Sequence, residues 1–169
     1  MSLSLLLINP GGGELIYQDL AREHAAVEPP LWCRLIAGYV RDRGWSVDIL
    51  DAAAHDMTPD QIAVYVRNNR PRLVCVVAHG HQPSASTQSM TGAGAVCQAI
   101  KRDDAGRPII IGGGHVAALP ERTLREESVD FACNGEGPIT VARLLAGDAL
   151  ADIPGLVWRD GGQFVRNAA

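Results

Sequence analysis

The stretch Leu73-Val-Cys-Val-Val-Ala78 decides the fold class, because six consecutive apolar residues just after Pro71 are typical of a strand that is buried on both faces. Four further short apolar runs alternate with amphipathic segments around it, at residues 3–8, 45–50, 108–111 and 129–133. A strand buried on both faces belongs in the middle of a parallel sheet with helices on either side. The pattern therefore predicts an α/β fold, a doubly wound, Rossmann-like (βα)5 domain in three layers around a central parallel sheet.

Helix signals fill the spaces between these runs. Thr58-Pro59 is a typical helix start, with Thr58 as the N-cap and proline at the first position. The helix that follows the central strand is expected to take Ser86 or Thr87 as its N-cap. The remaining helices are predicted within residues 30–44, 119–127 and 138–147.

The end of the chain has a different pattern. Two short runs at residues 156–159 and 163–166 surround Asp160-Gly161-Gly162, which predicts a β-hairpin with a glycine turn. We expect residues 1–150 to form the α/β domain and residues 151–169 to be an appended hairpin. Such a hairpin could connect to a further domain or pair edge to edge with a partner protein.

Composition excludes several classes of protein. Of 169 residues 47% are apolar and 20% are charged, so one domain with a sizeable core is expected. The net charge of −4 makes nucleic acid an unfavoured partner, because a negatively charged protein does not attract a phosphate backbone. No apolar run approaches the roughly 20 residues of a membrane span, and residues 3–8 are too short for a signal peptide, so a cytoplasmic protein is expected.

The four cysteines are far apart in the sequence and form no CxxC or CxxxCxxC pattern. This spacing favours reduced thiols buried in the core over a zinc or iron–sulfur site. They are Cys33, Cys75, Cys97 and Cys133.

Small and polar residues follow four of the five predicted strands. Because the carboxyl ends of parallel strands meet at one edge of a sheet, these segments converge there. Glycine lets a ligand lie against the backbone, although each glycine alone could simply supply a tight turn. Four such segments together favour a ligand-binding edge: residues 11–13, 79–88, 112–115 and 134–137.

A nucleotide site fits this edge poorly. Ile16 stands where GxGxxG requires its third glycine, and Asp51 lies 40 positions beyond Gly11 rather than the roughly 20 of the dinucleotide fingerprint. No P-loop motif is present. A stand-alone nucleotide-binding or protein-interaction module stays open as the alternative function.

Five motifs at successive element boundaries resemble one family. They are Asn9-Pro-Gly-Gly-Gly13, Glu28-Pro-Pro-Leu31, Gln82-Pro-Ser-Ala-Ser-Thr-Gln88, Gly112-Gly-Gly-His115 with Pro120-Glu121, and Asn134-Gly-Glu-Gly137. In this order, over residues 3–145, they resemble the N-terminal cobalamin (vitamin B12)-binding domain of cobalamin-dependent radical S-adenosylmethionine enzymes. That group includes methyltransferases and the anaerobic magnesium-protoporphyrin IX monomethyl ester cyclase type.

The resemblance implies a corrin ring lying across the strand ends, with its dimethylbenzimidazole tail in a slot between the sheet and flanking helices. Residues carried over by position to the corrin are Gly11, Gly12, Gly13 and Tyr17. Those carried over to the tail are Ser84, Ser86 and Thr87 after the third strand, Gly112, Gly113 and Gly114 after the fourth, and Gly135, Glu136 and Gly137 after the fifth. Further residues implied to bind the cofactor are Gln82, Ala85 and His115.

One departure concerns the cobalt ligand. Better-known cobalamin domains carry DxHxxG after the first strand, where the histidine displaces the base and binds cobalt, but this chain has Asn9-Pro10-Gly11. The resemblance therefore implies base-off cobalamin whose lower axial position is empty, filled by water or taken by another residue. Three histidines at strand ends are candidate cobalt ligands, although a histidine in a turn could equally be solvated: His79, His81 and His115.

The resemblance also implies a larger enzyme. This chain lacks the CxxxCxxC motif, so the [4Fe-4S] cluster and S-adenosylmethionine are expected in a radical domain that follows in the same protein. We expect the hairpin to lead into that domain and the chain alone to be non-catalytic. The implied reaction of the whole enzyme is methyl transfer or oxidative cyclisation.

Overall fold

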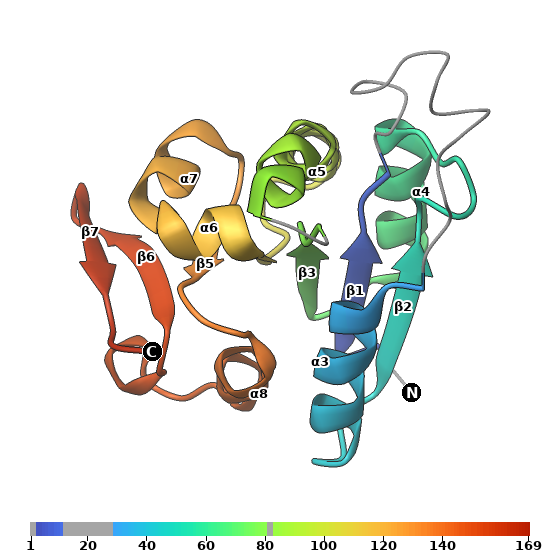
Figure 1. Cartoon of the computed structure of the whole chain (residues 1–169). Coiled ribbons are helices and arrows are strands. Elements are labelled where there is room, and N and C mark those ends of the chain that lie inside the picture. The colour runs from blue at the N-terminus through green and yellow to red at the C-terminus, as the bar shows by residue number, and fades with distance from the viewer. Residues whose placement is uncertain (1–2, 12–28, 81–82) are drawn as a thin grey trace.

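A seven-stranded sheet runs through the middle of the structure (Figure 1), a computed structural model that describes residues 3–11, 29–80 and 83–169. The strand order is β2-β1-β3-β4-β5-β6-β7, with β1 to β5 parallel and β6 and β7 antiparallel. The five parallel strands confirm the predicted α/β fold. The strands are β1 (Leu5–Asn9), β2 (Val47–Asp51), β3 (Leu73–Val77), β4 (Ile109–Gly112), β5 (Phe131–Cys133), β6 (Leu156–Asp160) and β7 (Gln163–Arg166).

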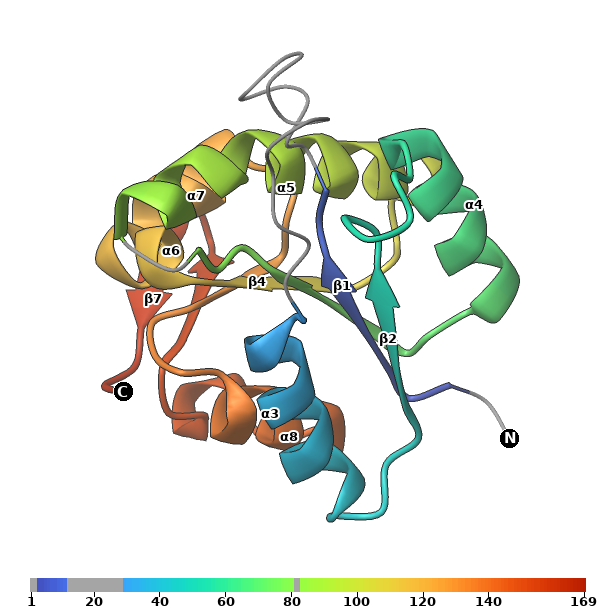
Figure 2. The same cartoon turned by 45° about the vertical axis from the view of Figure 1, so that its right-hand side comes forward.

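Helices cover both faces of this sheet. In Figure 2, α3 and α8 lie on one side, and α4, α5, α6 and α7 lie on the other. This arrangement gives the three layers that the sequence predicts. The helices are α3 (Leu31–Arg41), α4 (Pro59–Asn69), α5 (Pro83–Asp103), α6 (Gly114–Ala118), α7 (Pro120–Glu126) and α8 (Pro138–Ala146), followed by the 3-10 turn η1 (Leu150–Asp152).

The apolar strands supply both halves of the core. Leu5 and Leu7 pack into the cluster on the α3 and α8 side, whereas Leu6 and Ile8 pack into the cluster on the α4 and α5 side. All four side chains are fully buried. Successive side chains of a strand point to opposite faces, and so a strand covered on both faces must be apolar at every position.

The two helix starts predicted most specifically differ in outcome. Thr58 caps α4 with a complete capping box, in which its hydroxyl accepts from the Gln61 amide and the Gln61 side chain accepts from the Thr58 amide. The predicted N-cap of α5 is wrong, because α5 begins at Pro83 and places Ser86 and Thr87 inside its first turns. The reason is that proline suits a first helical turn, where no backbone N–H is needed.

The predicted C-terminal hairpin is confirmed as β6 and β7, and its strands continue the central sheet. Strand β6 pairs antiparallel with β5, with Phe131 opposite Trp158. Ile153, Leu156 and Val157 are fully buried. The open edge of β5 and the apolar residues of β6 together make this pairing favourable. A domain boundary after residue 150 and a connecting role for the hairpin stay predictions.

Within the described ranges, no helix is long and apolar enough to cross a membrane. All four cysteines are buried free thiols, as their spacing predicts.

Candidate functional site

The candidate site lies beside the point where the sheet changes direction. Strand β1 is flanked by β2 on one side and β3 on the other, so the chain winds outward from it in opposite directions. Ligands of open α/β sheets bind beyond the carboxyl ends of strands at such a switch point. Three of the four polar segments identified in the sequence follow β3, β4 and β5 at this edge.

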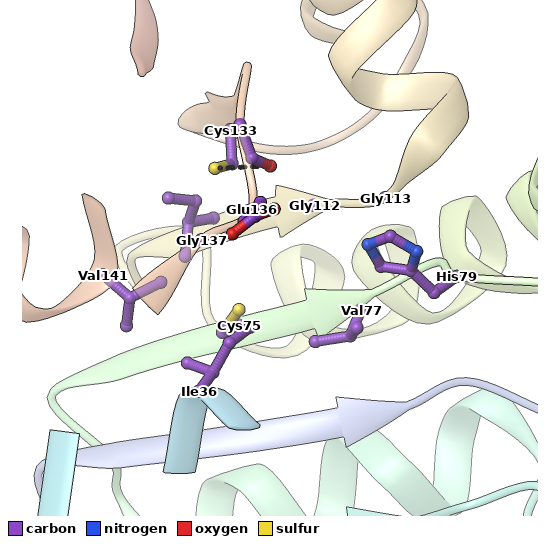
Figure 3. A pocket seen from close by; sticks show the side chains of 12 residues that line it. Ile36, Cys75, Val77, His79, Gly112, Gly113, Cys133, Glu136, Gly137 and Val141 are labelled. Atoms are coloured by element: carbon purple, nitrogen blue, oxygen red, sulfur yellow. Dashed lines mark hydrogen bonds between the residues drawn. The ribbon is translucent and has the colours of Figure 1, made fainter. Parts of the chain in front are cut away.

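A narrow cleft, open to solvent, enters the structure between β3 to β5 and the helices α3 and α8 (Figure 3). We call this cleft the glycine slot. Its glycines are Gly112, Gly113, Gly135 and Gly137, and its other lining residues are Ile36, Cys75, Val77, His79, Ile110, Cys133, Glu136 and Val141.

Two of the slot glycines are required by the backbone. Gly113 has φ +150°, and a Cβ at this position would overlap the carbonyl oxygen of Ala78. Gly137 has φ +100°, and its Cβ would stand 3.1 Å from Cδ1 of Ile36. Residues with a side chain rarely adopt such φ values, so glycine keeps the backbone bare at these two positions of the slot.

The loop of residues 134–137 forms the far wall, and the C-terminal hairpin holds it. The backbone N–H of Asn134 donates to the carbonyl of Gly155 over 2.7 Å, and Arg166 donates to the Asn134 side chain over 2.9 Å. The Thr140 hydroxyl, at the start of α8, donates to the carbonyl of Pro154 over 2.7 Å. The hairpin therefore fixes one wall of the slot.

The interior of the slot is apolar and carries no net charge. Its walls are aliphatic, and burial raises the pKa of the Cys75 and Cys133 thiols, so both stay protonated near neutral pH. Glu136 is exposed at the rim and is the one charged side chain among the described lining residues. Such a slot suits a flat, neutral group better than a polyphosphate.

His79 stands at the end of β3 on the rim of the slot (Figure 3). Its ring stacks on Trp32 of α3, with 4.4 Å between ring centroids and 15° between ring planes. Both side chains are half-buried. Desolvation by burial lowers the pKa of His79, so its imidazole is neutral near pH 7.

The structure places another group of predicted residues away from the slot. The Ser86 hydroxyl accepts from the Gly80 N–H over 3.1 Å and donates to the Ala78 carbonyl over 3.2 Å, tying β3 to α5. Thr87 lies 3.1 Å from Nδ1 of His115, between α5 and α6. Ala85, Gly114 and His115 likewise do not line the slot.

Most of the remaining predicted residues lie in segments that the structure does not describe. Gly12, Gly13, Tyr17, His81 and Gln82 lie outside the described residues, and of Ser84 only its place in α5 is given. Gly11 lies just after β1, where an added Cβ would stand 3.5 Å from the backbone of Ala52 and Ala53. Roles for all of these residues stay predictions.

The sequence does not mark the aliphatic and thiol residues of the slot as ligand-binding, because each has the pattern of an ordinary core residue. Ile36 and Val141 occupy the buried stripes of α3 and α8, and Cys75 lies mid-strand in β3. The signal that could have found two of them is position, since Cys75 lies on the strand that precedes one polar segment and Val141 lies on the helix that follows another. Among the described residues, no group of three or more His, Cys, Asp or Glu is placed to hold a metal ion.

Comparisons with known proteins agree with this geometry. Residues 17–145 match the family model described as B12 binding domain. An uncharacterized methyltransferase of Pyrococcus horikoshii is 32% identical over 144 residues, covering 82% of this chain and 29% of the relative. The anaerobic magnesium-protoporphyrin IX monomethyl ester cyclase of Synechocystis is 29% identical over 145 residues, covering 81% and 28%. The chain thus spans less than a third of the curated relatives it matches.

Solved structures show the same fold. The radical S-adenosylmethionine methyltransferase TsrM of Kitasatospora setae, with cobalamin and a [4Fe-4S] cluster bound, superimposes with a TM-score of 0.73 at 20% identity. The cobalamin-dependent S-adenosylmethionine radical enzyme OxsB, with aqua-cobalamin bound, gives 0.70 at 18%. Each match covers 99% of this chain, and 29% and 22% of the respective solved chains.

Proposed function

The chain belongs to the B12 binding domain family, and on this premise we propose that it binds cobalamin with the nucleotide tail in the glycine slot. The observation that carries the proposal is the slot itself, a cleft with bare backbone on one wall and aliphatic side chains on the other, at the carboxyl edge of the sheet. The corrin then lies over the strand ends above it.

The slot residues fit the chemistry of the tail. A benzimidazole base is flat and apolar on both faces, and the aliphatic walls contributed by Ile36, Val77 and Val141 suit such a surface. Gly112 and Gly113 let the base lie directly against β4 and its following turn. In this role the chain's own residues bind the tail, orient it and exclude water from it.

We propose further that the cofactor is held base-off. Asn9-Pro10-Gly11 follows β1, where related domains with DxHxxG supply a histidine to cobalt. A tail buried in the slot is removed from the cobalt. Bound cobalamin supplies a cobalt centre for alkyl or electron transfer, and this chain would keep one face of the corrin open.

The role in a whole enzyme is also a proposal. The similar methyltransferase and cyclase are each more than three times longer than the matched region, and TsrM and OxsB carry a radical S-adenosylmethionine activity. We propose that this chain acts as the cobalamin module of such an enzyme, together with a radical domain in the same protein. Methyl transfer and oxidative cyclisation are the two candidate reactions.

Cobalamin binding is tested by titrating the purified chain with hydroxocobalamin and recording the visible spectrum of the protein-bound fraction. We expect a protein-bound spectrum, with the absorption bands of base-off cobalamin. Gly112→Val should weaken binding because it narrows the slot without a strained φ: a Cβ there meets only Cβ of Cys133, at 3.6 Å. Gly38→Val is the matched control, since a Cβ at Gly38 on α3 meets nothing within 4 Å.

Two outcomes contradict the proposal. Wild-type protein that retains no cobalamin at tens of micromolar would refute cobalamin binding by this chain. Equal binding by the Gly112→Val and wild-type proteins would place the tail outside the glycine slot. Circular dichroism of each variant verifies that it is folded.

A further inference from the structure

Among the side chains of the described slot residues, His79 is the strongest hydrogen-bond donor that has no hydrogen-bond partner. Within residues 3–11, 29–80 and 83–169 its ring stacks on Trp32 and makes no hydrogen bond. The Cys133 thiol, by contrast, already lies 3.5 Å from the Gly135 carbonyl and 3.7 Å from the Thr140 hydroxyl. Cys75 carries a thiol, which is a weaker donor than an imidazole N–H.

The surroundings of His79 set the protonation state and the orientation of its ring. Burial against Trp32 keeps the imidazole neutral near pH 7, with one ring nitrogen protonated and the other an acceptor. The stack also limits the orientations of the ring, so less conformational entropy is lost when the ring meets a ligand. A neutral imidazole held by this stack thus lines a mainly apolar cleft.

A base-off tail brings an acceptor into that cleft. When benzimidazole leaves cobalt, its imine nitrogen regains an unshared pair, and burying this nitrogen without a partner costs free energy. Glu136 cannot satisfy it as a carboxylate, because a carboxylate only accepts hydrogen bonds. Among the described lining side chains, His79 is the donor best suited to that nitrogen.

We infer that His79 donates an N–H hydrogen bond to the free nitrogen of the tail base and so makes this chain discriminate among corrinoids by their tail. The inference rests on the proposed cobalamin function. In this inference His79, which follows β3, determines which corrinoid binds and takes no part in catalysis.

The test compares three corrinoids in direct binding assays. Cobalamin has the nitrogen base, a cobamide with a phenolic tail keeps the nucleotide loop without that nitrogen, and cobinamide lacks the tail. In His79→Phe the ring that stacks on Trp32 is kept and the N–H is lost. We expect this variant to bind cobalamin about 3- to 10-fold more weakly and to bind the other two unchanged. His79→Gln, which restores an N–H donor, should recover part of the loss.

The outcomes separate this inference from the proposed function. If the wild-type protein binds none of the three corrinoids, the cobalamin function fails and the inference with it. If the wild-type protein binds cobalamin but His79→Phe weakens all three equally, or weakens none, the cobalamin function stands and the donor role is refuted. Thermal unfolding of each variant verifies that it is folded.

Electron paramagnetic resonance of bound cob(II)alamin supplies a second readout. A base-off cofactor without an axial nitrogen ligand should show no nitrogen superhyperfine splitting. Splitting that disappears in His79→Phe would make His79 a cobalt ligand, and splitting that persists would show the base still on cobalt. Either result overturns the inferred hydrogen bond.

Discussion

Gly113 is the residue of the slot where the backbone has least freedom. Its φ of +150° and the overlap of a Cβ with the Ala78 carbonyl require glycine at the turn between β4 and α6. We expect Gly113→Ala to lower the free energy of unfolding by about 2–4 kcal/mol, through backbone strain and steric overlap. Urea denaturation followed by circular dichroism measures this change.

Gly112→Ala is the matched control for that substitution. The neighbouring glycine has no positive φ, and its Cβ would meet Cβ of Cys133 at an ordinary contact distance of 3.6 Å. We expect a change below about 1 kcal/mol. An equally small effect of both substitutions would show that the turn tolerates a side chain at Gly113.

Ser86 is a second residue whose role is clear from its contacts. Ser86 is 2% exposed, and its hydroxyl bonds both the Gly80 N–H and the Ala78 carbonyl. Ser86→Ala removes both bonds, and we expect it to cost about 1–3 kcal/mol in denaturant unfolding. Ser89→Ala is the control, because the Ser89 hydroxyl only bonds Ala85 within the same helix, an interaction that adds little. A result in which Ser89→Ala costs more than Ser86→Ala would contradict this assignment.

At the scale of elements, the hairpin of β6 and β7 is part of the core. Removing residues 153–169 deletes three fully buried side chains and exposes the edge of β5. It also frees the loop of residues 134–137 from Gly155 and Arg166. We expect the shortened protein to lose its cooperative unfolding transition, as followed by tryptophan fluorescence and circular dichroism.

Gln163→Ala serves as the control for this truncation, because Gln163 is exposed in β7. It should shift the unfolding midpoint little. A shortened chain that still unfolds cooperatively near the wild-type midpoint would show that the hairpin is dispensable for the fold. The hairpin would then be an appended connector.

At the scale of the whole molecule, stability should depend on pH through Glu127. This residue follows α7, is half-buried and lies against Gly94 of α5. Burial, with a smaller contribution from the charge of Glu126, raises the pKa of Glu127 above its ordinary value of 4.5. The folded state therefore holds this proton more tightly than the unfolded state, and stability falls as pH rises from 4.5 through the folded-state pKa.

Glu127→Gln should remove this penalty. We expect the variant to be more stable than the wild-type protein at pH 8, with the difference shrinking as pH falls toward 4.5, in urea denaturation at a series of pH values. Glu121→Gln, at an exposed position of α7, is the control and should leave the profile unchanged. A constant difference between Glu127→Gln and wild-type protein at every pH would contradict the assignment.

Local signals predicted the elements of this fold well. The runs at residues 73–78 and 3–8 are found as β3 and β1, and Thr58 caps α4 as expected. Each of these features depends on residues that are close in sequence. A strand is recognised by its run of apolar residues, and a helix cap by a side chain that bonds the backbone a few residues further on. The prediction of the N-cap of α5 was wrong, because several hydroxyl residues and Pro83 in one segment are all suited to the start of a helix. The local pattern does not show which of them begins it.

The same limit explains what was predicted of the site. Gly112, Gly113, Gly135, Glu136 and Gly137 were predicted from glycine-rich strand ends, and the structure brings them together around one slot. Ser86 was predicted for the same tail, which stays a prediction, and in the structure its hydroxyl bonds to the backbone at the junction of β3 and α5. A hydroxyl in a polar segment can face a ligand or the backbone, and only the path of the chain decides between them.

Sequence alone thus determined the layered α/β class, the glycine edge and the family resemblance, because periodicity and glycine placement are local properties of the chain. Tertiary structure decided the rest: that β6 completes the sheet, that α3 and α8 close the slot, and that Trp32 stacks on His79, 47 positions away. These contacts join residues far apart in sequence, and their partners are chosen by the global packing of the two core clusters rather than by any local pattern.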